Sequence, residues 1–196
     1  MPEVHNSNPL GFGISPFYLV PIERVTNGVP IIDTNHAQIH AGNAFSFAKH
    51  QSLAAGASLD VTFEVPAGAY VHFQAFDVVS DGLNELTVKL YEGTTLNATP
   101  GGTAITPVNR HRVGTPESSV LTVKHGATID ADGTELDEMF LPKVSSGAVK
   151  NMATKGDSIE WILKPEEVYL LRLENTGTTT ALVAVVRPFW YEEGGA

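Results

Sequence analysis

The clearest pattern in the chain is an alternation of apolar and polar residues. Between residues 58 and 65 apolar side chains occupy every second position, and Pro66 follows. Because successive side chains of a strand point to opposite faces, this pattern predicts a strand with one buried face. Comparable patterns predict further strands at residues 70–77, 86–91, 120–125, 159–163, 168–174 and 180–186. The chain is therefore expected to consist mainly of strands.

Two short links between these runs predict hairpins. Residues 66–68 (Pro-Ala-Gly) join the runs 58–65 and 70–77, and residues 175–178 (Asn-Thr-Gly-Thr) join the last two runs. Links of this length and composition are typical of turns between antiparallel neighbours. The few helix candidates are residues 44–55 and a single turn at residues 136–141.

The connections between the strands indicate the architecture. Uneven strand spacing and long loops favour Greek-key crossovers over a meander. We therefore predict an all-β fold, an antiparallel two-sheet β-sandwich of jelly-roll type, formed by residues 36–196. Residues 1–35 contain five prolines and read as an extended N-terminal arm, because proline interrupts both helices and strand pairing.

The arm is too apolar to remain in water as a flexible tail. Its side chains either cover one edge of their own domain or dock on a neighbouring subunit. Fully extended, 35 residues reach roughly 115 Å, enough to cross onto adjacent subunits. The candidate partner-binding residues of the arm are Phe12, Ile14, Phe17, Tyr18 and Ile22.

Composition excludes several classes of protein. The 196 residues fit one domain, and the absence of cysteine removes disulfides and thiolate chemistry. A net charge of −10 argues against a nucleic-acid partner, which requires a basic surface. The longest apolar run, residues 181–186, is far shorter than the roughly 20 residues of a membrane span. The first residues lack the features of a secretory signal, so synthesis in the cytoplasm is expected.

Histidines are the best candidates for metal chemistry. His36 and His40 have the i, i+4 spacing that places two ligands on one helix face, and Asp33 is a possible third ligand. Pro30 and Gly42 bracket only about two turns, however, and we expect no helix there. On a strand the two histidines would lie roughly 13 Å apart, too far to bind one ion. We therefore predict no metal site and no cofactor.

Other catalytic signals are weak. Residues 130–138 contain five carboxylates, but they do not match a calcium-binding EF-hand loop, so a solvated acidic loop is expected and structural calcium stays an alternative. There is no Gly-x-Ser-x-Gly nucleophile motif. We therefore predict that the protein is not an enzyme.

Two short segments are candidates for contacts with a partner. Arg110 and Arg112 form the main basic cluster and could anchor acidic groups of a partner or of this chain. Trp190 lies in the aromatic run 189–191 near the end of the last strand, and at least one of these rings is expected near the surface. Core packing, a subunit interface and a sugar-binding platform are the alternatives for this run. Trp161 is expected in the core.

Three stretches, residues 36–47, 107–112 and 173–192, resemble the capsid decoration (cement) proteins of tailed bacteriophages. The resemblance covers roughly residues 33–193. It implies a β-sandwich or jelly-roll module on the outside of the phage head, commonly a trimer, that binds the major capsid protein after head expansion. It implies no enzymatic activity, and it places candidate contacts in residues 109–112 and in the arm. Other virion components, such as a head fibre or tail protein, and a carbohydrate-binding or adhesion β-sandwich are the alternatives; a cupin-like metalloenzyme is a third.

Overall fold

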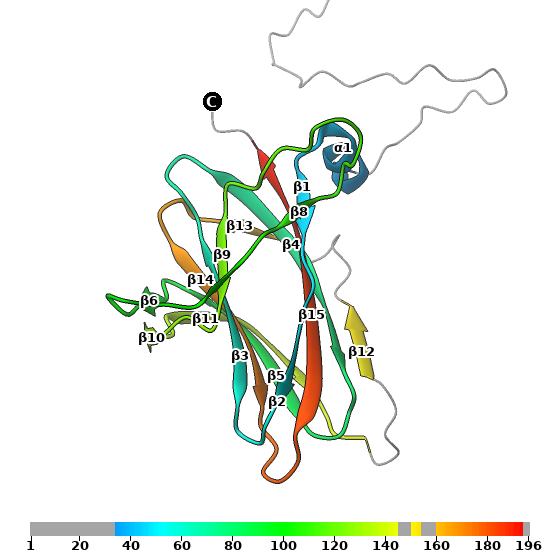
Figure 1. Ribbon diagram of the computed structural model, residues 1–196, viewed down its shortest axis with the longest axis vertical. Coiled ribbons are helices and arrows are strands. Elements are labelled where there is room, and N and C mark those ends of the chain that lie inside the picture. The colour runs from blue at the N-terminus through cyan, green and yellow to red at the C-terminus, as the bar shows by residue number, and fades with distance from the viewer. Residues whose placement is uncertain (1–33, 145–149, 154–159, 194–196) are drawn as a thin grey trace, which may run out of the picture. The chain divides into compact units, whose positions relative to one another are not determined.

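The computed structural model describes residues 34–144, 150–153 and 160–193, which form a two-sheet β-sandwich (Figure 1). Within these ranges the secondary structure is almost entirely strand, with one short helix, α1 (Thr34–Ala41). The predicted all-β sandwich is therefore confirmed. The helix α1 has eight residues and is too short to cross a membrane. Among the described residues, no helix is both long and apolar enough to do so.

The first sheet has the order β12-β4-β15-β1-β8, with β13 beside β4 and β2 beside β15. Its long central strand β15 pairs antiparallel with β4 on one side and with β1 and β2 on the other. The strands are β1 (Ala44–Ser46), β2 (Lys49–Leu53), β4 (Tyr70–Ser80), β8 (Val108–Asn109), β12 (Lys150–Ala153), β13 (Trp161–Leu163) and β15 (Leu182–Glu193).

The second sheet has the order β11-β5-β14-β3-β9-β7, and a separate ribbon pairs β6 with β10. In it β14 is central and pairs with β3 and β5 over most of its length. These strands are β3 (Ser58–Glu64), β5 (Leu86–Glu92), β6 (Thr95–Leu96), β7 (Thr103–Ile105), β9 (Thr122–His125), β10 (Ile129–Ala131), β11 (Thr134–Leu141) and β14 (Val168–Asn175).

The core lies between the two sheets and has an aromatic centre. Phe63 of β3 contacts Phe73 of β4 edge-on at 5.3 Å between ring centroids, and Trp190 of β15 at 6.3 Å. These side chains are at most 2% exposed. Trp161 is half-buried and packs against this core, in keeping with its expected place. The alternating patterns predicted the inward positions of Phe63 and Phe73, because one face of each strand had to be buried.

Both predicted hairpins are wrong, because each short link crosses from one sheet to the other. β3 pairs with β9 and β14, whereas β4 pairs with strands of the first sheet; β14 and β15 are separated in the same way. The Asn175 side chain helps to direct the second crossing, since its amide donates to the carbonyls of Leu53, Ala54 and Thr180. Strands distant in sequence supply the ladder partners that a hairpin would have used.

The helix predictions are also wrong. Residues 44–55 form β1 and β2, because Phe45, Phe47 and Leu53 point into the core at strand spacing. Residues 136–141 belong to β11 at the edge of the second sheet. Conversely, α1 forms where no helix was expected. Its last residue, Ala41, is followed by Gly42, whose φ of +83° is the left-handed conformation that glycine adopts readily at a helix C-terminus. The predicted arm comprised residues 1–35. Residues 1–33 lie outside the described residues, and residues 34 and 35 are the first two residues of α1.

Candidate functional site

One end of the sandwich brings together several of the residues singled out from the sequence. Here α1, the loop of residues 110–120 and the last residues of β15 meet; we call this region the α1 end (Figure 1). The backbone ties its parts together, since the amide of Arg110 donates to the carbonyl of Ala44 at 2.8 Å, and the amide of Glu192 to the carbonyl of Asn43 at 3.0 Å. Residues 1–33 directly precede α1 in the sequence.

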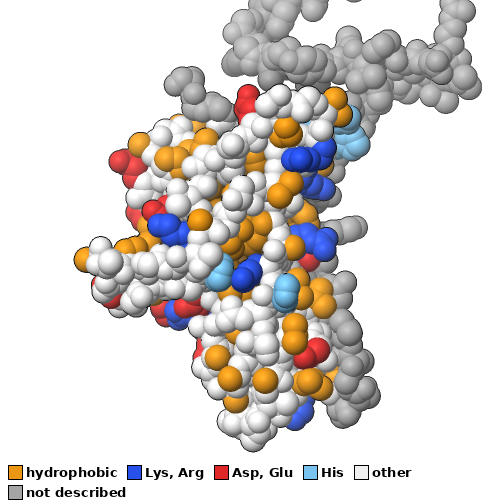
Figure 2. Space-filling view, in the orientation of Figure 1, with side chains coloured by type: hydrophobic (Ala, Val, Ile, Leu, Met, Phe, Trp, Pro, Cys, Tyr) orange, Lys and Arg blue, Asp and Glu red, His pale blue; other side chains and the backbone are white. Residues whose placement is uncertain are grey.

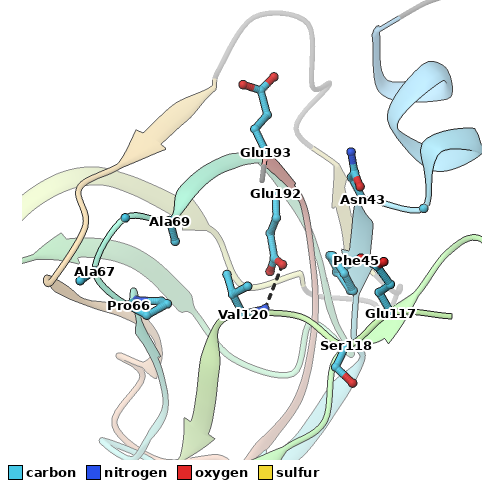
Figure 3. Close-up of a pocket in the computed structure, with 12 residues that line it drawn as sticks. Asn43, Phe45, Pro66, Ala67, Ala69, Glu117, Ser118, Val120, Glu192 and Glu193 are labelled. Carbon is cyan, nitrogen blue, oxygen red and sulfur yellow. Dashed lines mark hydrogen bonds between the residues drawn. The ribbon is translucent and has the colours of Figure 1, made fainter. Parts of the chain in front are cut away.

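A buried carboxylate holds the 110–120 loop in place. Glu192 is 8% exposed and lies beside the loop (Figure 3). Its Oε2 accepts the Val120 amide proton at 2.9 Å, and its Oε1 accepts the Trp190 Nε1 proton at 2.9 Å and the Ser119 hydroxyl proton. Charge-assisted hydrogen bonds of this kind are the strong ones, so the carboxylate fixes the loop on β15.

Asn109 connects the loop to the end of α1. Its side-chain amide donates to the carbonyls of Gly42, at 2.6 Å, and Glu117, at 3.3 Å, while its Oδ1 accepts the amide proton of His111 at 2.8 Å. Asn109 is 3% exposed. One buried side chain therefore fixes both ends of the loop relative to the helix.

The fixed loop presents two arginines to solvent. Arg110 and Arg112 are exposed, and no described carboxylate lies within ion-pair distance of either guanidinium. The Arg110 guanidinium lies over the Phe189 ring at 5.3 Å, a cation–π contact that limits its conformations. Figure 2 shows Lys or Arg side chains next to His side chains at this end. The loop also carries the exposed apolar side chains of Val113 and Val120, and Val108 of β8 precedes it.

A shallow hollow of about 270 Å³ opens beside the loop (Figure 3). Phe45 and the 66–69 link form apolar parts of its wall, and the carboxylates of Glu117, Glu192 and Glu193 are its acidic groups. Glu192 already accepts three hydrogen bonds from the protein. Its carboxylate is therefore committed to holding the loop rather than aimed at a ligand.

A second polar cluster lies on the outer face of the first sheet. His72 Nδ1 is 2.9 Å from Glu160 Oε1, its Nε2 is 3.7 Å from Glu193 Oε2, and its ring stacks on Tyr191 at 4.3 Å. The Tyr191 hydroxyl donates to Glu160 at 3.0 Å. Burial, together with this hydrogen bond, raises the pKa of Tyr191. The cluster links the chain before β13 to β4 and β15, and its polar groups are satisfied by one another.

Trp190 was predicted to contact a partner, but the structure places its side chain in the core. It is 1% exposed and packs against Phe45, Phe47 and Phe63 in the core. Its position on β15 is the reason: the buried residues of this strand fall at every second position from Leu182, and Trp190 continues that inward face. Of the aromatic run, Phe189 is the half-buried ring near the surface, beneath Arg110. Phe12, Ile14, Phe17, Tyr18 and Ile22 lie outside the described residues.

The expected acidic loop at residues 130–138 is instead ordered strand and turn. Asp132 binds Arg172 at 2.7 Å, and Glu135 and Glu138 both contact Lys89. These carboxylates are paired with cations along the sheet. Among the described residues, no three His, Asp or Glu side chains converge as a set of metal ligands.

The histidine pair requires a correction to the sequence reasoning. No helix was expected from the sequence around His36 and His40, and therefore no shared ligand site. The helix is present as α1, and it places both histidines on one exposed face. Their Nε2 atoms are 2.8 Å apart. Pro30 did not prevent the helix because it lies outside the helical residues Thr34–Ala41.

Sequence reasoning missed the residues that build this end. Glu192 carried a usable signal, because the i, i+2 spacing from Trp190 places both on the inward face of one strand. Asn109 and His72 carried none, since the bond of Asn109 to the helix end is made to Gly42, 67 residues away, and the carboxylates around His72 are 88 and 121 residues away. No protein-family model matches the chain, and no characterised protein matches it significantly in sequence.

Proposed function

We propose that the protein is a virion structural protein that binds the outside of the major capsid protein lattice and stabilises the phage head. The 110–120 loop carries the proposal: it is an exposed element, held by Asn109 and Glu192, with two arginines and two exposed valines on a chain of net charge −10. Arginine with apolar neighbours is typical of the residues that dominate protein–protein interfaces.

The geometry of the loop favours contact with an acidic protein surface. Arg110 and Arg112 have no described carboxylate partner in a chain that carries ten more acids than bases. Asn109 and Glu192 hold the loop before a partner arrives, which lowers the ordering cost of binding. Electrostatic complementarity of this kind mainly sets specificity and the association rate.

The remaining parts of the proposal follow from the resemblance and the strand order. We assign the sandwich to the jelly-roll class because one sheet contains β2-β15-β4-β13 and the other β3-β14-β5-β11. Consecutive main strands alternate between the sheets, except that β5 and β11 are neighbours in the second sheet. The arm would clamp the protein to the lattice from the α1 end. The protein would act as a trimer on the capsid exterior, with no enzymatic activity.

The test is co-sedimentation with expanded phage heads that lack this protein. The double variant Arg110→Glu and Arg112→Glu is expected to lose at least about tenfold in affinity, equal to about 1.4 kcal/mol. Lys143→Glu is the control, because Lys143 is exposed and follows β11, away from the α1 end. Equal binding by the double variant and the control would contradict the proposal, and binding to a glycan array instead of heads would favour the carbohydrate-binding alternative.

A further inference from the structure

We propose that His36 and His40 form a two-histidine chelate for a divalent transition-metal ion on the exposed face of α1. The inference does not rest on the proposed function. It rests on the position of the two rings: both side chains are exposed, and their Nε2 atoms lie 2.8 Å apart.

The helix supplies the correct spacing. Residues four apart lie one above the other on one helix face, with Cβ atoms about 5–6 Å apart. In α1 this brings the imidazole centroids to 4.6 Å, with the ring planes inclined by 32°. The two Nε2 atoms therefore approach each other at the outer edge of the pair, where solvent and ions have access.

The separation of the nitrogens indicates which ions fit. Two imidazole nitrogens about 2.0 Å from one ion are about 2.8 Å apart when they occupy neighbouring square-planar or octahedral positions, and about 3.3 Å apart in a tetrahedron. The distance of 2.8 Å matches the first geometry. Tetragonal nitrogen coordination is typical of Cu²⁺ and Ni²⁺, so these ions are the expected ligands.

The surroundings hold the helix ready for an ion. The side-chain oxygen Oδ1 of Asn35 accepts a hydrogen bond from the side-chain amide of Gln74 in β4. The Oε1 of Gln38 accepts one from the side-chain amide of Asn43 at 3.0 Å, so both turns of α1 are attached to the sandwich. His40 lies in the last turn of α1. A positive ion there interacts favourably with the negative end of the helix dipole.

The metal-free pair is a hydrogen bond in which one neutral ring donates and the other accepts. Metal binding needs both Nε2 lone pairs, so the donating ring changes its tautomer: it loses the Nε2 proton to solvent and takes up a proton from solvent at Nδ1, with no net release. No third histidine or carboxylate converges on the pair among the described residues.

The test is calorimetric titration of the full-length protein with Ni²⁺, together with the electron paramagnetic resonance spectrum of added Cu²⁺. We expect one Ni²⁺ per chain, and a Cu²⁺ spectrum with two equatorial nitrogens. His36→Ala or His40→Ala should each weaken binding by about 100-fold, because loss of one arm removes the chelate effect. Affinity should also fall as the pH is lowered, since only neutral imidazole binds metal.

Two controls separate the pair from general histidine binding. His50→Ala removes another exposed histidine and is expected to leave the affinity unchanged. The double variant His40→Ala and Ala41→His keeps the number of histidines but moves the second ring about 100° around the helix, and it should bind as weakly as the single variants. Unchanged affinity in His36→Ala, or wild-type affinity in the double variant, would overturn the proposal. Circular dichroism of each variant shows that the fold is retained.

Discussion

Glu192 offers the sharpest test of how the α1 end is held together. The change is Glu192→Gln, which keeps the shape of the side chain and removes one acceptor oxygen. The matched control is Glu193→Gln on the next residue, whose side chain is 54% exposed. The two variants make the same chemical change on opposite faces of one strand.

The structure sets the size of the expected effect. Glu192 accepts protons from the Val120 amide, the Trp190 indole and the Ser119 hydroxyl. A glutamine in its place has one acceptor oxygen and one NH₂ group. In either orientation that NH₂ faces the Val120 amide or the Trp190 indole, and both of these can only donate. One unpaired buried donor costs about 1–3 kcal/mol, and loss of the charge weakens the remaining bonds, so we expect about 2–4 kcal/mol in total.

Thermal and urea unfolding measure this difference. In a domain of this size 1 kcal/mol corresponds to about 2–4 °C, so Glu192→Gln should lower the Tm by about 4–16 °C, whereas Glu193→Gln should change it by less than about 2 °C. Hydrogen exchange of the Val120 amide should accelerate in the Glu192 variant alone. Equal Tm values for the two variants, with unchanged exchange at Val120, would refute the assigned role of the carboxylate.

Three further outcomes are expected. Hydrogen bonds from Lys164 and Tyr169 lower the pKa of Glu92 below its ordinary 4.5, so its stabilising contribution is present above that pH and is lost as the pH falls through the folded-state pKa. The Tm of Glu92→Gln should thus lie below wild type at pH 7 and converge with it in acid; a constant gap would contradict this. Gly133→Ala should cost more than about 2 kcal/mol in urea unfolding, because φ is +94° and a Cβ there would lie 2.2 Å from the Glu92 carbonyl oxygen; wild-type stability would contradict the close contact. Removal of residues 1–32 should leave the Tm nearly unchanged yet abolish head binding, since we propose that these proline-rich residues contact the lattice; an unfolded truncation would assign the arm to the domain's own core.

The local pattern determined the strands and their buried faces. A period of two is a property of the strand itself, so residues 58–65, 70–77 and 86–91 could be assigned without knowledge of their neighbours. Composition likewise determined the acidic charge and the lack of thiol chemistry.

Pairing between the strands, by contrast, was decided by tertiary structure. Strand partners come from distant segments, so β3 and β4 occupy different sheets although only five residues separate them. Trp190 continues the inward alternation of β15, but the rings that cover it, Phe45, Phe47 and Phe63, come from distant segments. The histidine pair is the clearest case: the spacing of His36 and His40 was visible in the sequence, but a helix of eight residues depends for its stability on its contacts with the sandwich. Only the folded chain, which supplies those contacts, brings the two rings together.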